Sequence, residues 1–293
     1  MRTNINSAQK QVRDISLLVI FLLSIIPQSL SAQKNKQLLI LHTNDTHSCI
    51  MPLSENLADT LLAGRGGFLR RISMLKEERA KNPNLLYFDS GDFSQGSSYY
   101  TLYMGDVEIG LMNQMGIDAA TIGNHEFDFG LENMARIFKM ANFPIVCANY
   151  DFTGTVVEGT VKPYVIIKRD GVKIGVFGVA PKMEGLVSST KCEGVKYLDP
   201  AKVALETATL LKKKMKCDLV ICISHLGWNK GDEDDSYMIK GSRNIDLVLG
   251  GHSHTYFTKL EYEQDLDGKM VPVDQNGKHG LYIGRLLLDL KKK

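Results

Sequence analysis

Short apolar runs, each followed at once by polar residues, recur along most of this 293-residue chain. Continuous apolar runs of this kind, bounded by turn-forming residues, are typical of strands that are buried on both faces of a sheet. The pattern predicts five such strands, at Leu38–Leu41, Leu85–Phe88, Ala119–Ile122, Val220–Ser224 and Asp246–Leu249.

Between these runs, apolar residues recur three and four positions apart, which is the spacing of one face of a helix. The predicted helices cover residues 68–81, 106–115, 131–140 and 200–214. Pro200 suits the first turn of the last helix, and the lysines at its end suit the negative end of a helix dipole. Strands that alternate with helices indicate an α/β fold.

One segment departs from this alternation. Val161–Lys168 and Val172–Val179 flank a turn-forming Arg-Asp-Gly, a pattern that predicts a β-hairpin. The last stretch, Leu281–Leu290, alternates loosely and predicts a closing strand. A hairpin in this position indicates two packed sheets in place of one doubly wound sheet.

Composition and charge exclude some classes of protein. The chain is 44% hydrophobic and 23% charged, as ordinary globular proteins are, and its formal net charge is +2. Residues 1–32 account for that excess, because 32 basic and 32 acidic side chains remain without them. A neutral mature chain gives no electrostatic reason to expect nucleic acid or a membrane as a partner.

The N-terminus has the pattern of an export signal. Basic residues precede the apolar run Ile15–Ile26, which Pro27 ends, and small residues follow. We predict a cleaved signal peptide over residues 1–32 and one mature domain over residues 33–293. The mature chain would be periplasmic or extracellular, with no membrane association after cleavage. An uncleaved anchor is the alternative, although a spanning helix needs about 20 apolar residues.

The chain has five cysteines, an odd number that leaves at least one thiol unpaired in a monomer. Cys147 and Cys222 lie in apolar runs and are predicted to be small buried hydrophobic residues. No pair has CxxC spacing, so a thiolate zinc site is not expected.

Polar clusters follow each of the five predicted strands. In an open sheet flanked by helices, residues just beyond the strand ends converge on one crevice. Carboxylate, amide and imidazole groups gathered there are ligands for divalent ions, and their number suits two ions better than one. The clusters are Asp45-Thr46-His47, Gly91-Asp92, Gly123-Asn124-His125-Glu126, His225 and Gly251-His252-Ser253-His254. We therefore predict a metal-dependent hydrolase.

Each cluster also has a simpler interpretation. Asp45 and His47 would point to one side of an extended segment, yet such pairs occur by chance in loops. Asn124 could cap a helix, with Glu126 in its first turn, but this interpretation gives no role to His125. The joint pattern is stronger, because five of the seven histidines follow predicted strands. The remaining two, His42 and His279, match no ligand pattern and are expected to be structural.

The ordered series Asp-Thr-His, Gly-Asp, Gly-Asn-His-Glu-Phe-Asp, Ser-His-Leu-Gly and Gly-His-Ser-His resembles the calcineurin-like metallophosphoesterases. The segments LLILHTNDTHS, DSGDFSQGS and GNHEFDFG most resemble the exported 5′-nucleotidase branch of that superfamily. The resemblance extends from Leu38 to Leu290, and it implies a four-layer α/β/β/α sandwich.

The resemblance also implies a ligand set and a mechanism. It places Asp45, His47, Asp92 and His254 on one divalent ion, and Asp92, Asn124, His225 and His252 on the other. Asp92 would bridge the two ions, which could be Zn, Mn, Fe or Co. His125 and Asp128 would form a catalytic dyad outside the metal shell, and Asn124 and His125 would also contact the substrate. The implied activity is release of phosphate from nucleotides by a 5′-nucleotidase-type phosphomonoesterase.

Nucleotidases of this branch usually carry a second, C-terminal domain that binds the nucleoside, and we expect this chain to hold the catalytic domain only. One expectation is a looser phosphoesterase that works alone. The other, which we favour, is a catalytic subunit that needs a separate substrate-binding polypeptide. The same scaffold would also suit a phosphodiesterase, a UDP-sugar or cyclic-nucleotide hydrolase, or a sulfur-ester hydrolase. A binding protein that lacks catalysis would have lost a ligand or the His125–Asp128 dyad, and this chain retains both.

Overall fold

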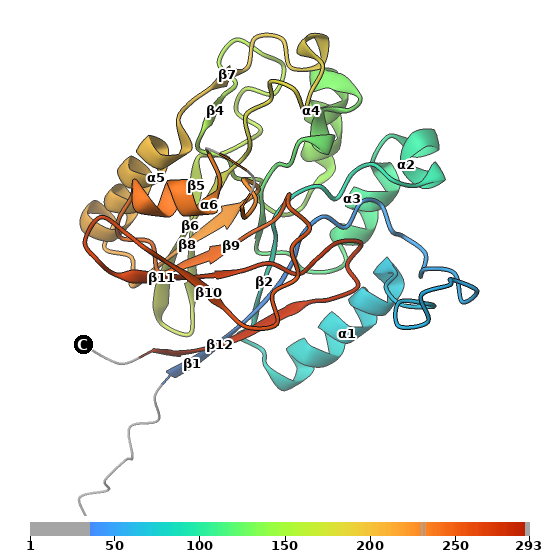
Figure 1. Ribbon diagram of the computed structural model, residues 1–293, viewed down its shortest axis with the longest axis horizontal. Helices are drawn as coiled ribbons and strands as arrows, with labels where there is room; N and C mark the ends of the chain where they lie inside the picture. The colour runs from blue at the N-terminus through green and yellow to red at the C-terminus, as the bar shows by residue number, and fades with distance from the viewer. Residues whose placement is uncertain (1–35, 230, 232, 291–293) are drawn as a thin grey trace, which may run out of the picture. The chain divides into compact units, whose positions relative to one another are not determined.

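The computed structural model describes residues 36–229, 231 and 233–290 (Figure 1). The predicted signal peptide over residues 1–32 lies outside the described residues. Among the residues that are described, no helix combines the length and the apolar composition needed to cross a membrane.

Two sheets form the centre of the fold. The four-stranded sheet has the order β12-β1-β2-β3, with β1, β2 and β3 parallel and β12 antiparallel to β1. Its strands are β12 (Gly284–Leu290), β1 (Lys36–Thr43), β2 (Leu86–Asp89) and β3 (Ala119–Ala120). The predicted closing strand is therefore confirmed, and it pairs with the first strand of the chain.

The six-stranded sheet has the order β10-β11-β9-β8-β6-β5, with a parallel centre and one antiparallel strand at each edge. Its strands are β10 (Glu261–Gln264), β11 (Met270–Asp274), β9 (Leu247–Leu249), β8 (Leu219–Ser224), β6 (Val172–Val179) and β5 (Tyr164–Arg169). The predicted hairpin is β5–β6, and it forms one edge of this sheet. A short pair, β4 (Tyr150–Asp151) and β7 (Lys196–Tyr197), lies apart from both sheets.

Helices cover the outer faces of the sheets (Figure 1). The helices are α1 (Phe68–Lys81), α2 (Ser98–Tyr103), α3 (Asp106–Met112), α4 (Gly130–Met140), α5 (Pro200–Thr209) and α6 (Asp235–Lys240). A π-helical turn, η3 (Leu210–Lys214), continues α5, and two 3-10 turns are η1 (His125–Phe127) and η2 (Ser189–Lys191). All four predicted helices are present, and the second ends three residues earlier than expected.

Three apolar clusters account for this layering. One lies between the two sheets, where residues such as Ile40 and Phe88 meet Ile221 and Leu249. A second packs α1, α3 and α4 on the four-stranded sheet, and a third packs α5 and α6 on the six-stranded sheet. The fold is the predicted α/β/β/α sandwich. Burial of both faces of each central strand explains why those strands are apolar throughout.

All five cysteines are free thiols in this structure. Cys147 and Cys222 are buried, as their positions in apolar runs predicted. Burial raises the pKa of the Cys147 thiol to about 12, which keeps it protonated and unreactive.

Candidate metal centre

The predicted polar clusters meet at one edge of the two sheets. Asp45 and His47 follow β1, Asp92 follows β2, His225 follows β8, and His252 lies beyond β9. Asn124 and His125 follow the short strand β3, which ends two residues earlier than predicted. Convergence of strand ends from both sheets brings donors from distant parts of the chain together.

The donor atoms form three groups of three, each with its atoms within 4.8 Å of one another, and two of these groups share no residue. Asp45, His47 and His254 make one group, in which the Nε2 atoms of the two histidines are 2.9 Å apart. Asp92, His225 and His252 make the other. Each of these two groups brings together three residues that the resemblance assigned to the same ion.

Asp92 lies between the groups. Its Oδ2 atom is 3.1 Å from His225 Nε2 and 4.0 Å from His47 Nε2. Asp45 has a similar reach, because its Oδ1 atom lies 3.3 Å from His254 Nε2 and 3.8 Å from His225 Nε2. Both carboxylates are almost fully buried, so their charges need compensation within the site.

Two buried atoms that make no hydrogen bond are suited to bind an ion. Among the described residues these include Asn124 Oδ1 and His225 Nε2, the latter with only its ionic contact of 3.1 Å to Asp92 Oδ2. His225 Nδ1 lies 2.6 Å from the Ser90 carbonyl oxygen, to which it donates, so in the neutral ring Nε2 carries the lone pair that could bind an ion. Buried polar atoms normally have partners, so the donor set fits a pair of divalent ions.

The unpaired amide oxygen argues against the simpler interpretation of Asn124. Asn124 precedes the 3-10 turn η1, but its side chain makes no capping hydrogen bond. Its carbonyl oxygen is directed elsewhere and lacks a partner. A capping role for Asn124 is therefore wrong.

The backbone geometry at the site differs from the prediction. Asp45 and His47 were expected on one side of an extended segment, but both have left-handed φ angles, 48° and 42°. Asp92, His252 and His254 are also left-handed, at 54°, 69° and 55°. Such conformations cost about 1–3 kcal/mol each and persist only where the surroundings enforce them. The ligands converge through tight loops and not through strand alternation.

A glycine permits the closest approach between two of the loops. A Cβ atom at Gly123 would overlap Asp92 Oδ1, far inside van der Waals contact. The same Asp92 oxygen accepts a hydrogen bond of 2.9 Å from the His125 backbone N–H. Any side chain at Gly123 would displace Asp92.

His125 and Asp128 are in contact, as the dyad requires. His125 Nδ1 lies 3.1 Å from Asp128 Oδ2, and both side chains are about one-third exposed. Burial lowers the pKa of His125, but the Asp128 hydrogen bond and the charge of Asp92 outweigh this and raise the pKa above its ordinary value. His125 also forms a third group within 4.8 Å with His47 and Asp92.

Electrostatics favour positive charge at His225, whereas burial lowers the pKa of His47. For His225, burial opposes protonation, but Asp92 and Asp45 raise its pKa to about 10. Burial raises the pKa of Asp92, and His225, His125 and His47 together lower it below the ordinary value. The buried carboxylates that favour a positive charge on His225 would also favour a metal cation at the same place.

Glu126 has a role that sequence reasoning missed. Its buried carboxylate accepts three backbone N–H groups, from Asp92 at 3.0 Å, Ser94 at 3.1 Å and Gly123 at 2.6 Å. It therefore ties the loop of Asp92 to the loop of Asn124. Burial and the Asp92 charge raise the pKa of Glu126 to about 7. Its place in the Asn-His-Glu run is the one signal that could have revealed it.

Asn44 is a second residue that was missed. Its Nδ2 atom donates to Asp45 Oδ2 at 2.6 Å and to the Gly277 carbonyl oxygen at 2.7 Å.

Two histidines were expected to be structural and not to bind metal. Of these, His42 lies 2.9 Å from Asp274 and away from the ligand groups. His279 lies beside the centre, with its ring 6.1 Å from that of His47.

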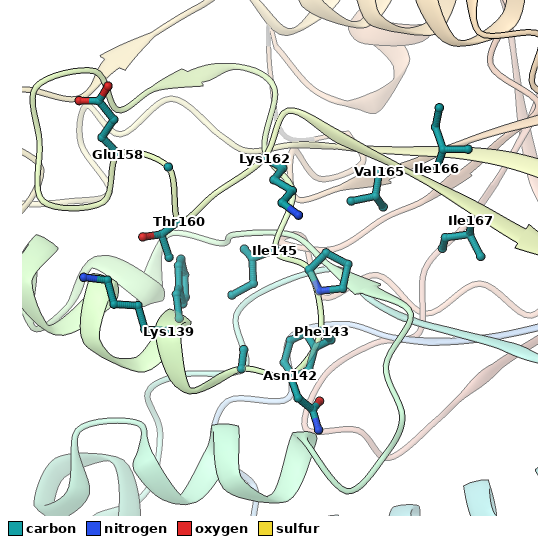
Figure 2. A pocket seen from close by; sticks show the side chains of 14 residues that line it. Lys139, Asn142, Phe143, Ile145, Glu158, Thr160, Lys162, Val165, Ile166 and Ile167 are labelled. Carbon is teal, nitrogen blue, oxygen red and sulfur yellow. The ribbon is translucent and has the colours of Figure 1, made fainter.

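A separate cavity of about 830 Å³ contains none of these residues. Figure 2 shows its lining, in which Phe143, Ile145 and Val165 lie near Lys139 and Lys162. Its lining offers no group of metal ligands. The functional site is therefore assigned from the chemistry of the donor atoms and not from the size of a cavity.

A four-layer sandwich with oxygen and nitrogen ligands at its strand ends defines the metallophosphoesterase class of fold. The family model of the calcineurin-like phosphoesterases matches residues 38–256 of this chain. The chain belongs to this family.

Relatives point to one branch. The chain is 30% identical to the 5′-nucleotidase of Bos taurus, over 88% of this chain and 47% of that protein. A 5′-nucleotidase precursor from Thermus thermophilus superimposes with a TM-score of 0.75 at 28% identity, covering 86% of this chain and 51% of that chain. The calcineurin-like phosphoesterase YfkN from Bacillus subtilis gives a TM-score of 0.71 at 29% identity, with 88% and 86% covered. The chain thus spans about half the length of the curated 5′-nucleotidases it matches.

Proposed function

We propose that this chain is a two-metal phosphoester hydrolase that releases phosphate from nucleotides. The observation that carries the proposal is the pair of three-donor groups, with Asp92 between them and the His125–Asp128 contact beside them. The 5′-nucleotidase relatives support a nucleotide as the substrate. The proposed ligands are Asp45, His47, Asp92, Asn124, His225, His252 and His254.

The residues divide into distinct tasks. When bound, two divalent ions would neutralise phosphoryl oxygens and lower the pKa of the attacking water. Asn124 and His125 would contact the phosphoryl group. The Asp128 hydrogen bond and the charge of Asp92 raise the pKa of His125, and Asp128 engages Nδ1, so a transferable proton would sit on Nε2. It would donate that proton to the leaving oxygen, while Asp128 keeps the imidazole oriented.

A substrate panel tests the proposed specificity. Rates with 5′-AMP, cyclic nucleotides, a UDP-sugar and bis(p-nitrophenyl) phosphate would be measured after loading with Zn, Mn, Fe or Co. We expect turnover of 5′-AMP to exceed that of the diester, since the relatives to which the chain is similar are 5′-nucleotidases. A diester preferred over 5′-AMP under every metal would instead support a phosphodiesterase.

We further propose that a separate substrate-binding polypeptide completes the nucleoside site. The support is the length of the 5′-nucleotidase relatives, of which this chain matches about half. The KM for 5′-AMP should fall when a co-purified polypeptide is added back to the isolated chain. A KM that no co-purified component alters would contradict this proposal.

Export of the mature chain is also proposed, on the basic and apolar pattern of residues 1–32. N-terminal sequencing of the mature protein should find a start near residue 33. An intact Met1 in that protein would contradict it.

Metal removal should destabilise the protein. Asp45 and Asp92 are nearly fully buried, and both lie close to His225. Loss of the ions would leave the two negative charges poorly compensated. A ligand present at a hundred times its Kd contributes about 2.7 kcal/mol. Chelation should therefore lower the Tm by about 5 °C per ion, and added Mn or Zn should restore it. An unchanged Tm in protein shown to be metal-free would count against the metal centre.

A further inference from the structure

His252 and His254 lie in a loop, residues 250–255, whose conformation is costly. Both histidines have left-handed φ angles, at 69° and 55°, a region that few non-glycine residues adopt. The loop follows β9 and has no place in a sheet ladder. We infer that contacts from outside the loop hold it, because left-handed conformations at two non-glycine residues are costly by themselves.

Gln275, the first residue after β11, makes the required contacts. Its Nε2 atom donates to the Gly251 carbonyl oxygen at 2.8 Å. Its Oε1 atom accepts from the Ser253 hydroxyl at 2.7 Å and from the Thr255 backbone N–H at 2.6 Å. Gln275 is fully buried, and these contacts are made to residues 251, 253 and 255, which alternate with the two histidines.

The surroundings strengthen this arrangement. The backbone of β11 is parallel to β9, and the Gly250 N–H donates to the Asp274 carbonyl oxygen at 2.7 Å. The Ser253 hydroxyl also accepts from the Trp228 N–H at 3.0 Å, three residues beyond His225. The contacts of Gln275 thus extend, through Ser253, to the loop that carries a third ligand.

We propose that Gln275 is a positioning residue that holds His252 and His254 in their metal-binding orientation. It acts through both ends of its amide and touches neither the ions nor the substrate. This inference rests on the metal centre proposed above. Groups that hold metal ligands in place commonly change metal affinity about 10–100-fold when they are lost.

The test is Co²⁺ binding by the full chain, followed by visible absorption and by metal analysis. Gln275→Met keeps the length of the side chain and its packing but loses all three hydrogen bonds. We expect its Co²⁺ affinity to fall about 10–100-fold, with an altered absorption spectrum. Raising Co²⁺ to saturation should recover much of the turnover, which a loss of folding would not allow.

Gln264→Met is the matched control. Gln264 is an exposed residue of β10, and its Nε2 atom donates to the Gly268 carbonyl oxygen at 3.3 Å. The same chemical change there should leave Co²⁺ affinity and spectrum at wild-type values. Thermal unfolding of each metal-free variant would report any general loss of stability.

A second variant covers the case in which Gln275→Met does not fold. Gln275→Glu still accepts from Thr255 but has no N–H for Gly251, so its Co²⁺ affinity should lie between those of wild type and the Met variant. Wild-type affinity and spectrum in the folded variant would overturn the role of Gln275, even if the metal-free Tm fell. A wild-type protein that binds no Co²⁺ would instead overturn the metal centre itself.

Discussion

Asp92→Asn should reduce phosphatase turnover by more than about 100-fold and lower the metal content of the purified protein. Asp92 Oδ2 is 3.1 Å from His225 Nε2 and 4.0 Å from His47 Nε2, so one carboxylate serves both donor groups. An amide has the same shape but no charge and a single acceptor oxygen. It would also present an N–H group to one side of the site, where a cation is expected.

Asp106→Asn supplies the control for this change. Asp106 forms a surface ion pair with Arg136, and both side chains are nearly half exposed. Exposed pairs of this kind contribute at most about 1 kcal/mol, so this variant should keep both its activity and its metal. Metal analysis and turnover would be measured on the same preparations. Full metal content together with near-wild-type turnover in Asp92→Asn would remove Asp92 from the centre.

Much of the fold could be predicted because burial on both faces leaves a simple pattern. The central strands β1, β2 and β8 are apolar through most of their length, and each was predicted within a few residues. The strand β10 was missed because its sequence, Glu-Tyr-Glu-Gln, alternates partly buried glutamates with exposed Tyr262 and Gln264 and so has no apolar face. The strand β3 is shorter than its apolar run because the chain turns early to bring Asn124 into the site.

The candidate ligands could also be predicted, but their local geometry could not. Strand ends place Asp45, Asp92 and His225 near one another whatever the loop conformation. The left-handed backbone at Asp45 depends on contacts with distant segments, such as the 2.9 Å hydrogen bond from its N–H to the Gly91 carbonyl oxygen. Gln275 lies 20 residues beyond Thr255 in the loop that it holds, and a partner so distant leaves no local signal in the sequence.

His125→Ala should reduce turnover by about 10²–10⁴-fold and leave the metal content near that of wild type. The contact that His125 makes with Asp92 uses its backbone N–H, at 2.9 Å, and alanine retains that group. The imidazole is held instead by Asp128, at 3.1 Å, and is about one-third exposed. Its removal therefore takes away the proposed proton donor without removing a ligand.

Asp128→Asn separates orientation from proton donation. The amide can still contact His125 Nδ1, but the lost charge removes part of what raises the His125 pKa, so turnover should fall less than in His125→Ala. Metal content is the measurement that decides between the two roles open to His125, because its ring also lies within 4.8 Å of donors on His47 and Asp92. Loss of one equivalent of metal in His125→Ala would make His125 a ligand. Retention of both equivalents with lost turnover would place it beside the ions, where the leaving oxygen is protonated.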